Sequence, residues 1–191
     1  RLAVVFDEEA VAGLLAVAVE GAFAFSALAF IAAYLHERFG LSLNVAAFIA
    51  ALFAAGGLVY ATCARWLVDR LGEGRLVLAG AALLGLSFLV MALTPHWSLA
   101  VPASMMAGLG FSMLHGTLQT HATQMVPDAR GTAVSLFGAS LFLGQSVGVF
   151  FASAVIDRLG FQIIFVVASL VIALLGVRFS GALRRRLLIA S

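Results

Sequence analysis

"LVDRLG" at residues 67–72 and "VIDRLG" at residues 155–160 are two copies of one short element, about half a chain apart. Each copy follows a long apolar run and precedes another one. An aliphatic–Asp–Arg–Leu–Gly turn that recurs in a chain so poor in charge indicates two units with the same internal organisation. The fold then depends on which side of a membrane each copy faces.

The composition places the chain in a lipid bilayer. Of its 191 residues, 63% are hydrophobic and 10% are charged, and the mean hydropathy is +1.13. Soluble domains carry about 25% charged residues, so this chain has too little polar surface to fold in water. The cations are all arginines beside apolar runs, which indicates membrane topology and not nucleic-acid binding. The single Cys63 excludes an internal disulfide and a cysteine-cluster metal site.

Six apolar segments come close to the roughly 20 residues that a transmembrane helix needs. They are residues 11–35, 43–64, 76–93, 99–123, 132–156 and 161–177. The sequence therefore predicts an all-α integral membrane protein, with six transmembrane helices in a single domain over residues 1–191. Within it we expect an N-terminal segment or linker at 1–10, three-helix repeats at 11–93 and 99–177, and a basic cytoplasmic tail at 178–191.

The arginines orient these spans. With six spans, one side of the membrane holds Arg1, Arg65, Arg70, Arg75, Arg130, Arg178, Arg184, Arg185 and Arg186. The other side holds Arg38 and Arg158. Because positive charge stays inside, both termini are predicted to be cytoplasmic in a multi-pass inner-membrane protein. The two Asp-Arg-Leu-Gly turns then face opposite sides, as in a 3+3 inverted repeat; the alternative is one good interfacial turn used twice by chance.

The first turn resembles the signature loop of the major facilitator superfamily, Gly-x-Leu-x-Asp-Arg-x-Gly-Arg-Arg/Lys. The matching residues are Leu67, Asp69, Arg70 and Gly72. The chain departs from the pattern at Arg65, which replaces the first glycine, and at Glu73-Gly74, which replace the basic pair, with Arg75 just beyond. "YLHERFGLSL" (34–43), "VPDARGTA" (126–133) and "GQSVG" (144–148) resemble further segments of the same family. Their order is similar to that of the C-terminal six-helix half, helices seven to twelve.

The resemblance implies secondary active transport of a small organic solute, and we expect proton-coupled efflux. Partners would be the solute, the bilayer and a second six-helix half, either an N-terminal half in the same chain or a second half-transporter. It also implies a gating loop on the cytoplasmic side, formed by Asp69, Arg70, Gly72, Arg75, Asp128 and Arg130. Asp128 is in addition a plausible N-cap for the fifth span. No cofactor, metal ion or nucleic acid is expected.

One acid lies deep in a predicted span. Glu20 stands near the middle of the first segment, on a face of mostly small apolar residues. A charge at the centre of a membrane costs on the order of 2.5 kcal/mol or more, so ionisable residues there are functional candidates. Glu20 is therefore predicted to carry a proton or to contact the substrate; the alternative is an acid paired with another helix for packing alone.

Polar residues of the fourth and fifth spans form the other half of the predicted site. Ser112, His115 and Gln119 recur at helical spacing, so they share one face of the fourth span. Gln145 lies near the middle of the fifth span, within the small-residue motif Gly144-x-x-x-Gly148. We expect Glu20, His115, Gln119, Gln145 and Ser112 to converge on one cavity. The alternative is hydrogen bonding that only holds helices together.

Two other function classes fit six membrane spans. A non-transporting structural membrane protein is the stronger, and Glu20 with the polar face of the fourth span argues against it. A rhomboid-like intramembrane serine protease needs a Ser-Gly context and a later His. Here Ser140 precedes Leu141, and the intramembrane histidines come before it. We therefore do not expect an enzyme.

Overall fold

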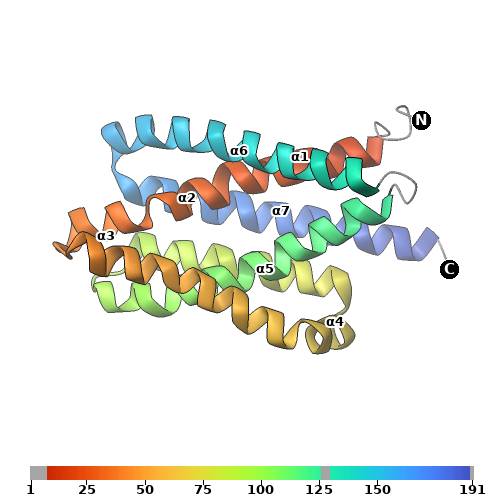
Figure 1. The fold of residues 1–191 in the computed structure, drawn as a ribbon, viewed down its shortest axis with the longest axis horizontal. Helices are drawn as coiled ribbons and strands as arrows, with labels where there is room; N and C mark the ends of the chain where they lie inside the picture. Colours follow the sequence, from red (N-terminus) through yellow and green to blue (C-terminus); the bar gives the residue numbers. More distant parts are fainter. Residues whose placement is uncertain (1–7, 126–129, 190–191) are drawn as a thin grey trace.

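The computed structural model describes residues 8–125 and 130–189, and every regular element in these ranges is a helix. The helices lie roughly along one long axis (Figure 1). In chain order they are α1 (Glu8–Glu20), π-helix η2 (Gly21–Phe25), α2 (Ser26–Ala29), α3 (Ile31–Phe39), α4 (Leu43–Leu93), 3₁₀-helix η3 (Trp97–Leu99), α5 (Ala100–Met125), α6 (Arg130–Leu159) and α7 (Phe161–Ile189). Five helical stretches are long and apolar enough to cross a membrane. The all-α membrane class predicted from the sequence is therefore confirmed.

Helix α4 folds back on itself at Gly72. A straight helix of its 51 residues would be about 75 Å long. Instead the backbone leaves the helical region at Gly72, with φ 69° and ψ 161°, and the chain reverses direction there (Figure 1). The far end of α4 thereby returns to α3, where Arg38 Nη2 donates a hydrogen bond to Thr94 O at 3.0 Å.

The connection expected at residues 65–75 is much shorter than predicted. Residues on both sides of Gly72 are helical, so the break is confined to one residue. The reason is local: Leu, Val and Arg are acceptable in a helix, whereas positive φ with extended ψ is a conformation that essentially only glycine adopts. The charged and polar residues in "RWLVDRLGEGR" suggested a loop, but most of this segment is helical.

Both copies of the Asp-Arg-Leu-Gly element interrupt the helix at a glycine with positive φ. Gly72 and Gly160 have φ values of 69° and 82°, and Gly40, which follows Arg38-Phe39, has a φ of 67°. Glycine is suited to these positions because it adopts positive φ without the steric penalty that a Cβ atom brings. The two copies lie at opposite ends of the bundle: the turn inside α4 lies at the end where α1 begins and α7 ends, and the turn between α6 and α7 lies at the other end (Figure 1).

Glycines let the helices pack at backbone distance. On α6, a Cβ atom at Gly144 would overlap Ala18 O, and one at Gly148 would overlap Ala22 O. Gly21 meets α6 in the same way, against Leu141 O. The small-residue motif of the fifth span thus seats α6 directly against the segment that carries Glu20.

Helix α7 continues beyond the end predicted for the sixth span. The sequence suggested a tail from residue 178, yet the helix runs to Ile189. Ser180 Oγ donates a hydrogen bond to Gly74 O at 2.7 Å, and Leu183 is buried. These contacts hold the end of α7 beside the turn at Gly72, so the region 178–183 packs as part of the bundle.

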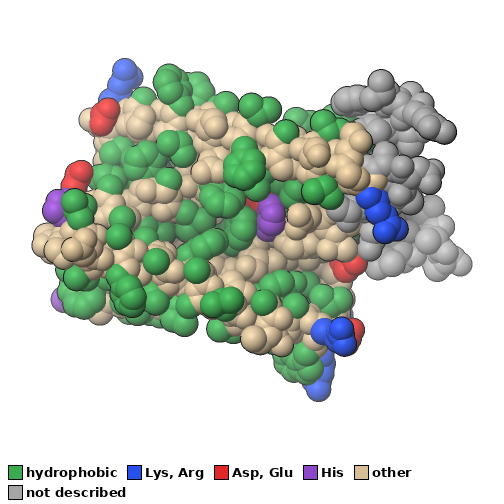
Figure 2. Space-filling model, in the orientation of Figure 1, with side chains coloured by type: hydrophobic (Ala, Val, Ile, Leu, Met, Phe, Trp, Pro, Cys, Tyr) green, Lys and Arg blue, Asp and Glu red, His purple; other side chains and the backbone are tan. Residues whose placement is uncertain are grey.

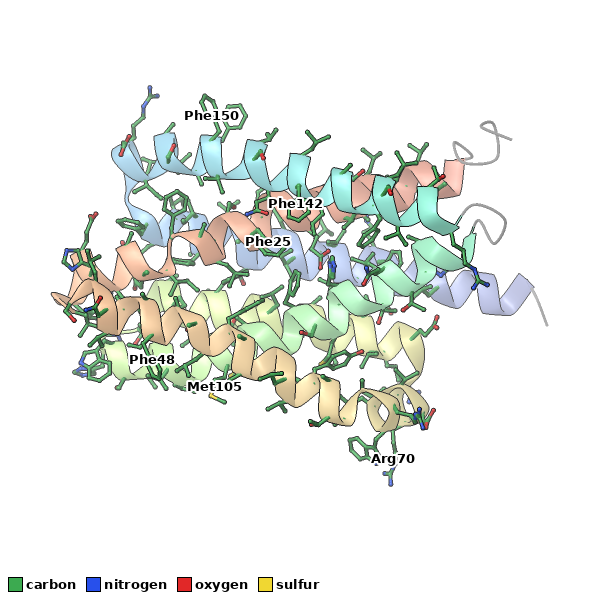
Figure 3. The ribbon with its side chains drawn as sticks, in the orientation of Figure 1. Phe25, Phe48, Arg70, Met105, Phe142 and Phe150 are labelled. Carbon is green, nitrogen blue, oxygen red and sulfur yellow. The ribbon has the colours of Figure 1, made fainter. Side chains whose placement is uncertain are left out.

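The outer surface is apolar along most of its length. Figure 2 shows hydrophobic side chains spread over the visible face, with the charged side chains gathered toward the two ends. Helix α6 exposes Phe142, Leu143, Phe150 and Phe151 by 61–71%, and Phe150 projects away from the bundle (Figure 3). Such a surface suits a bilayer or another apolar domain.

Candidate functional site

Glu20 and His115 form an ion-pair-distance contact in the middle of the bundle. Glu20 is the last residue of α1 and is 0% exposed. Its Oε2 lies 2.9 Å from Nδ1 of His115 on α5, 95 residues later in the chain. Figure 2 shows histidine atoms near the middle of the visible face, away from the charged ends. Two of the predicted site residues are therefore in direct contact.

The backbone around Glu20 is irregular. The α-helix gives way to a five-residue π-helix, Gly21–Phe25, immediately after the acid. A π-turn disturbs the helical hydrogen bonding, and here Ser26 Oγ donates to the carbonyls of Ala22 and Phe23. Such segments are rare and are frequent at functional sites. The widened turn lies against α6, where the glycine contact at Gly21 fixes its position.

Phenylalanine rings surround the histidine. The imidazole of His115 is stacked on Phe111, with ring centroids 4.8 Å apart and planes 15° apart. The ring of Phe137 on α6 also packs against the imidazole, with the two ring centroids 5.3 Å apart. Phe25 and Phe53 in turn pack on Phe111, with centroid-to-centroid distances of 5.1 Å and 5.5 Å. Rings from η2, α4, α5 and α6 therefore hold the imidazole in a defined orientation.

One oxygen of the carboxyl group has no hydrogen bond. In the described part of the chain, Glu20 Oε1 and Ser104 Oγ are the buried side-chain atoms without a partner. Leaving a buried polar atom unpaired costs about 1–3 kcal/mol, and more for a charged group. Packing alone would not favour an acid at this position. The arrangement instead suits a group that gains and loses a proton or meets a ligand.

The other predicted cavity residues lie around this pair without bonding to Glu20. Gln145 is half-buried, and its backbone nitrogen lies against Gly21. Ser112 is half-buried, and its Oγ would be 3.2 Å from a Cβ atom at Gly57. Gln119 is exposed. Convergence is therefore direct for Glu20 and His115 and only approximate for the three other side chains.

The phenylalanine cluster around His115 was not predicted from the sequence. Phe111 precedes His115 by four residues, so it shares its helical face, and this spacing was the available signal. Phe25, Phe53 and Phe137 come from three other elements, and nothing in their own segments indicates that they meet. The cluster depends on helix rotation, which an apolar run does not specify.

The predicted gating residues lie at the end of the bundle that contains Gly72. Asp69, Arg70, Arg75 and Arg130 are all exposed. Arg70 stacks over Trp66, with its guanidinium carbon 5.3 Å from the ring centroid, and points away from the bundle (Figure 3). In the described residues Asp69 has no hydrogen bond or ion pair to residues 130–132. Asp128 lies outside the described residues, so the gating contact stays a prediction.

The described residues form a helical bundle whose long apolar helices can span a bilayer, and a buried acid contacts a histidine within it. These features define a polytopic membrane protein with an ionisable centre. The sequence profile of the Major Facilitator Superfamily matches residues 13–187. The chain therefore belongs to this superfamily of transporters and is not an enzyme, which excludes the serine protease alternative.

The chain is also similar in sequence to a characterised transporter. The chain is 28% identical, over 128 residues, to the arabinose-proton symporter of Bacillus subtilis (strain 168). The matched region is 66% of this chain and 27% of the symporter. The chain thus spans about a quarter of the length of this relative.

Proposed function

We propose that this chain is one half of a proton-coupled secondary transporter for a small organic solute. The observation that carries the proposal is the contact between the buried Glu20 and the partly exposed His115, which places two ionisable groups 2.9 Å apart between apolar helices. Ionisable residues inside a membrane domain mark ion and substrate pathways. A relative that is named as a proton symporter supports proton coupling as well.

The half-transporter architecture is the second part of the proposal. The reversal at Gly72 turns five long helical stretches into six passages along the bundle. Those passages group into two sets of three, each with an Asp-Arg-Leu-Gly turn after its second passage. This arrangement supports a 3+3 inverted repeat and placement as helices seven to twelve. A second six-helix half would be needed to enclose a central cavity between the two halves.

The gating loop forms the third part. Asp69, Arg70, Gly72 and Arg75 lie at the end of the bundle where α6 begins with Arg130. The start of a helix has unpaired N–H groups that favour an anion. Asp69 therefore contacts the start of the fifth span, near Asp128 and Arg130, when the transporter closes on its cytoplasmic side.

A measurement of proton movement during transport distinguishes symport from antiport. The family resemblance led us to expect export, whereas the symporter name of the relative describes solute and proton moving together. In membrane vesicles that contain the intact protein, we would apply L-arabinose, other sugars and lipophilic amines in turn and record the external pH. External alkalinisation on addition of a probe indicates symport, and acidification indicates antiport. Folded protein that gives neither a pH change nor labelled-probe exchange with any of these probes would overturn the proposal.

Both termini are predicted to face the cytoplasm. In a Cys63→Ala background, His96→Cys should react with a membrane-impermeant maleimide in intact cells, whereas Ser191→Cys should react only after the cells are opened. The physical reason is the arginine bias, nine residues against two. His96 lies in the exposed connection before η3, at the end of the bundle opposite to Gly72. The reverse labelling pattern would show that both termini face outward and that the predicted topology is wrong.

A further inference from the structure

We infer that protons reach Glu20 through His115, so that the two residues act as a relay and the carboxyl group does not exchange directly with water. This inference rests on the proposed proton coupling and assigns the path within it. Glu20 is 0% exposed, whereas the side chain of His115 keeps 18% of its surface exposed. The histidine is thus the member of the pair that reaches the surface of the bundle, and we call the surface around it the open face.

The hydrogen bonding of Glu20 supports a single route. Among the described residues, His115 is the hydrogen-bond partner of the carboxyl group, and Oε1 has none. The imidazole presents Nδ1 to Oε2, which leaves Nε2 as the nitrogen for exchange with the open face. An imidazole has two nitrogens that each gain or lose a proton, so it can accept at one and donate at the other.

The proton steps balance without a change in ring orientation. A hydronium ion gives its proton to Nε2, which forms an imidazolium with N–H groups at both positions. The Nδ1 proton then passes to Oε2, leaving a neutral carboxyl group and a neutral imidazole with its proton on Nε2. Discharge reverses both steps: Oε2 returns its proton to Nδ1, and Nε2 releases one to water.

The phenylalanine contacts suit this scheme because they oppose rotation of the ring. Phe111 is stacked on the imidazole and Phe137 packs against it. A ring that stays in place keeps Nδ1 at the acid throughout the cycle. Loading and discharge then use the same nitrogen, and the side of the membrane changes only when the open face of the bundle changes its access.

The helices that pack around this pair carry other ionisable groups. On α6 they are Arg130, Asp157 and Arg158, and on α7 Arg178 and Arg184 to Arg186. On α4 they are Tyr60, Cys63, Arg65, Asp69, Arg70, Glu73 and Arg75, of which Tyr60 faces Gly116, next to His115. α1 and α5 add Glu8, Glu9 and His121. A phenol remains neutral near pH 7, so Tyr60 does not replace the imidazole.

The test compares His115→Asn with Glu20→Gln in membrane vesicles, with proton-driven flux and labelled-solute exchange of the same probe as readouts. Asparagine keeps a donor near the position of Nδ1 but cannot pass a proton, so proton-driven flux should fall by about a hundredfold, far more than exchange. Added imidazole should restore part of the flux in His115→Asn and none in Glu20→Gln. His121→Asn, on the same helix, is the matched control.

The outcomes separate the relay from the proposed function. Normal proton-driven flux in His115→Asn, with Glu20→Gln impaired, would overturn the relay and leave proton coupling at Glu20 intact. Equal losses of flux and exchange in His115→Asn, or no recovery with imidazole, would make His115 a structural partner of Glu20. Normal proton-driven flux in Glu20→Gln would instead overturn the coupling proposal itself.

Discussion

Glu20→Gln is expected to uncouple transport from the proton gradient. Glutamine has nearly the same shape and can still bond to His115 Nδ1, so the packing of this fully buried site is preserved. It cannot take up or release a proton, and a positioned proton-transfer group contributes about 10²–10⁴-fold to a rate. Proton-driven accumulation or export of the probe should therefore fall by at least about a hundredfold, while exchange of labelled for unlabelled solute persists.

The control for this variant is Glu37→Gln. Glu37 is exposed at the end of α3, so the same chemical change there should leave both readouts at the wild-type level. Proton-driven flux and exchange are measured in the same vesicle preparation, with the amount of protein determined by immunoblot. Wild-type proton-driven flux in Glu20→Gln across a pH gradient would mean that Glu20 is structural and that coupling occurs elsewhere in the transporter.

The apolar segments could be predicted from sequence because a bilayer imposes a length on every helix that crosses it. The breaks inside helices could not. Gly72 was placed in a loop of eleven residues, yet the helical propensity of its neighbours confines the break to that glycine. The π-helix after Glu20 depends on the contact between Gly21 and α6, which is a tertiary contact with no periodic signal in its own segment.

The candidate site was predictable as a set of residues and less so as a geometry. Glu20 could be identified because an acid in an apolar span is rare, and His115 because it belongs to a polar helical face. Their contact depends on how α1 and α5 are rotated about their axes. The same rotation leaves Gln119 exposed, although its spacing places it on the face of His115. Spacing reports which residues share a face and not which neighbour that face meets.

The double variant Gly144→Ala/Gly148→Ala is expected to give the largest loss of stability. Cβ atoms at these positions would overlap Ala18 O and Ala22 O, which are backbone atoms that cannot move aside as a side chain can. Overpacking costs about 1–3 kcal/mol at a single site, and each kcal/mol lowers the melting temperature of a protein of this size by roughly 2–4 °C. The melting temperature measured in detergent should therefore fall by several degrees for each single variant, and it should fall further for the double variant.

Gly138→Ala is the matched control for this pair. It lies on the same helix with no atom within 4 Å of its added Cβ, so its melting temperature should stay at or slightly above the wild-type value. The double variant should also impair proton-driven flux, because moving α6 away from α1 withdraws Phe137 from His115 and releases Gly21 from Leu141. A double variant with wild-type melting temperature and flux would show that α6 does not seat against Ala18 and Ala22. The orientation of His115 would then have to be fixed by contacts other than those of α6.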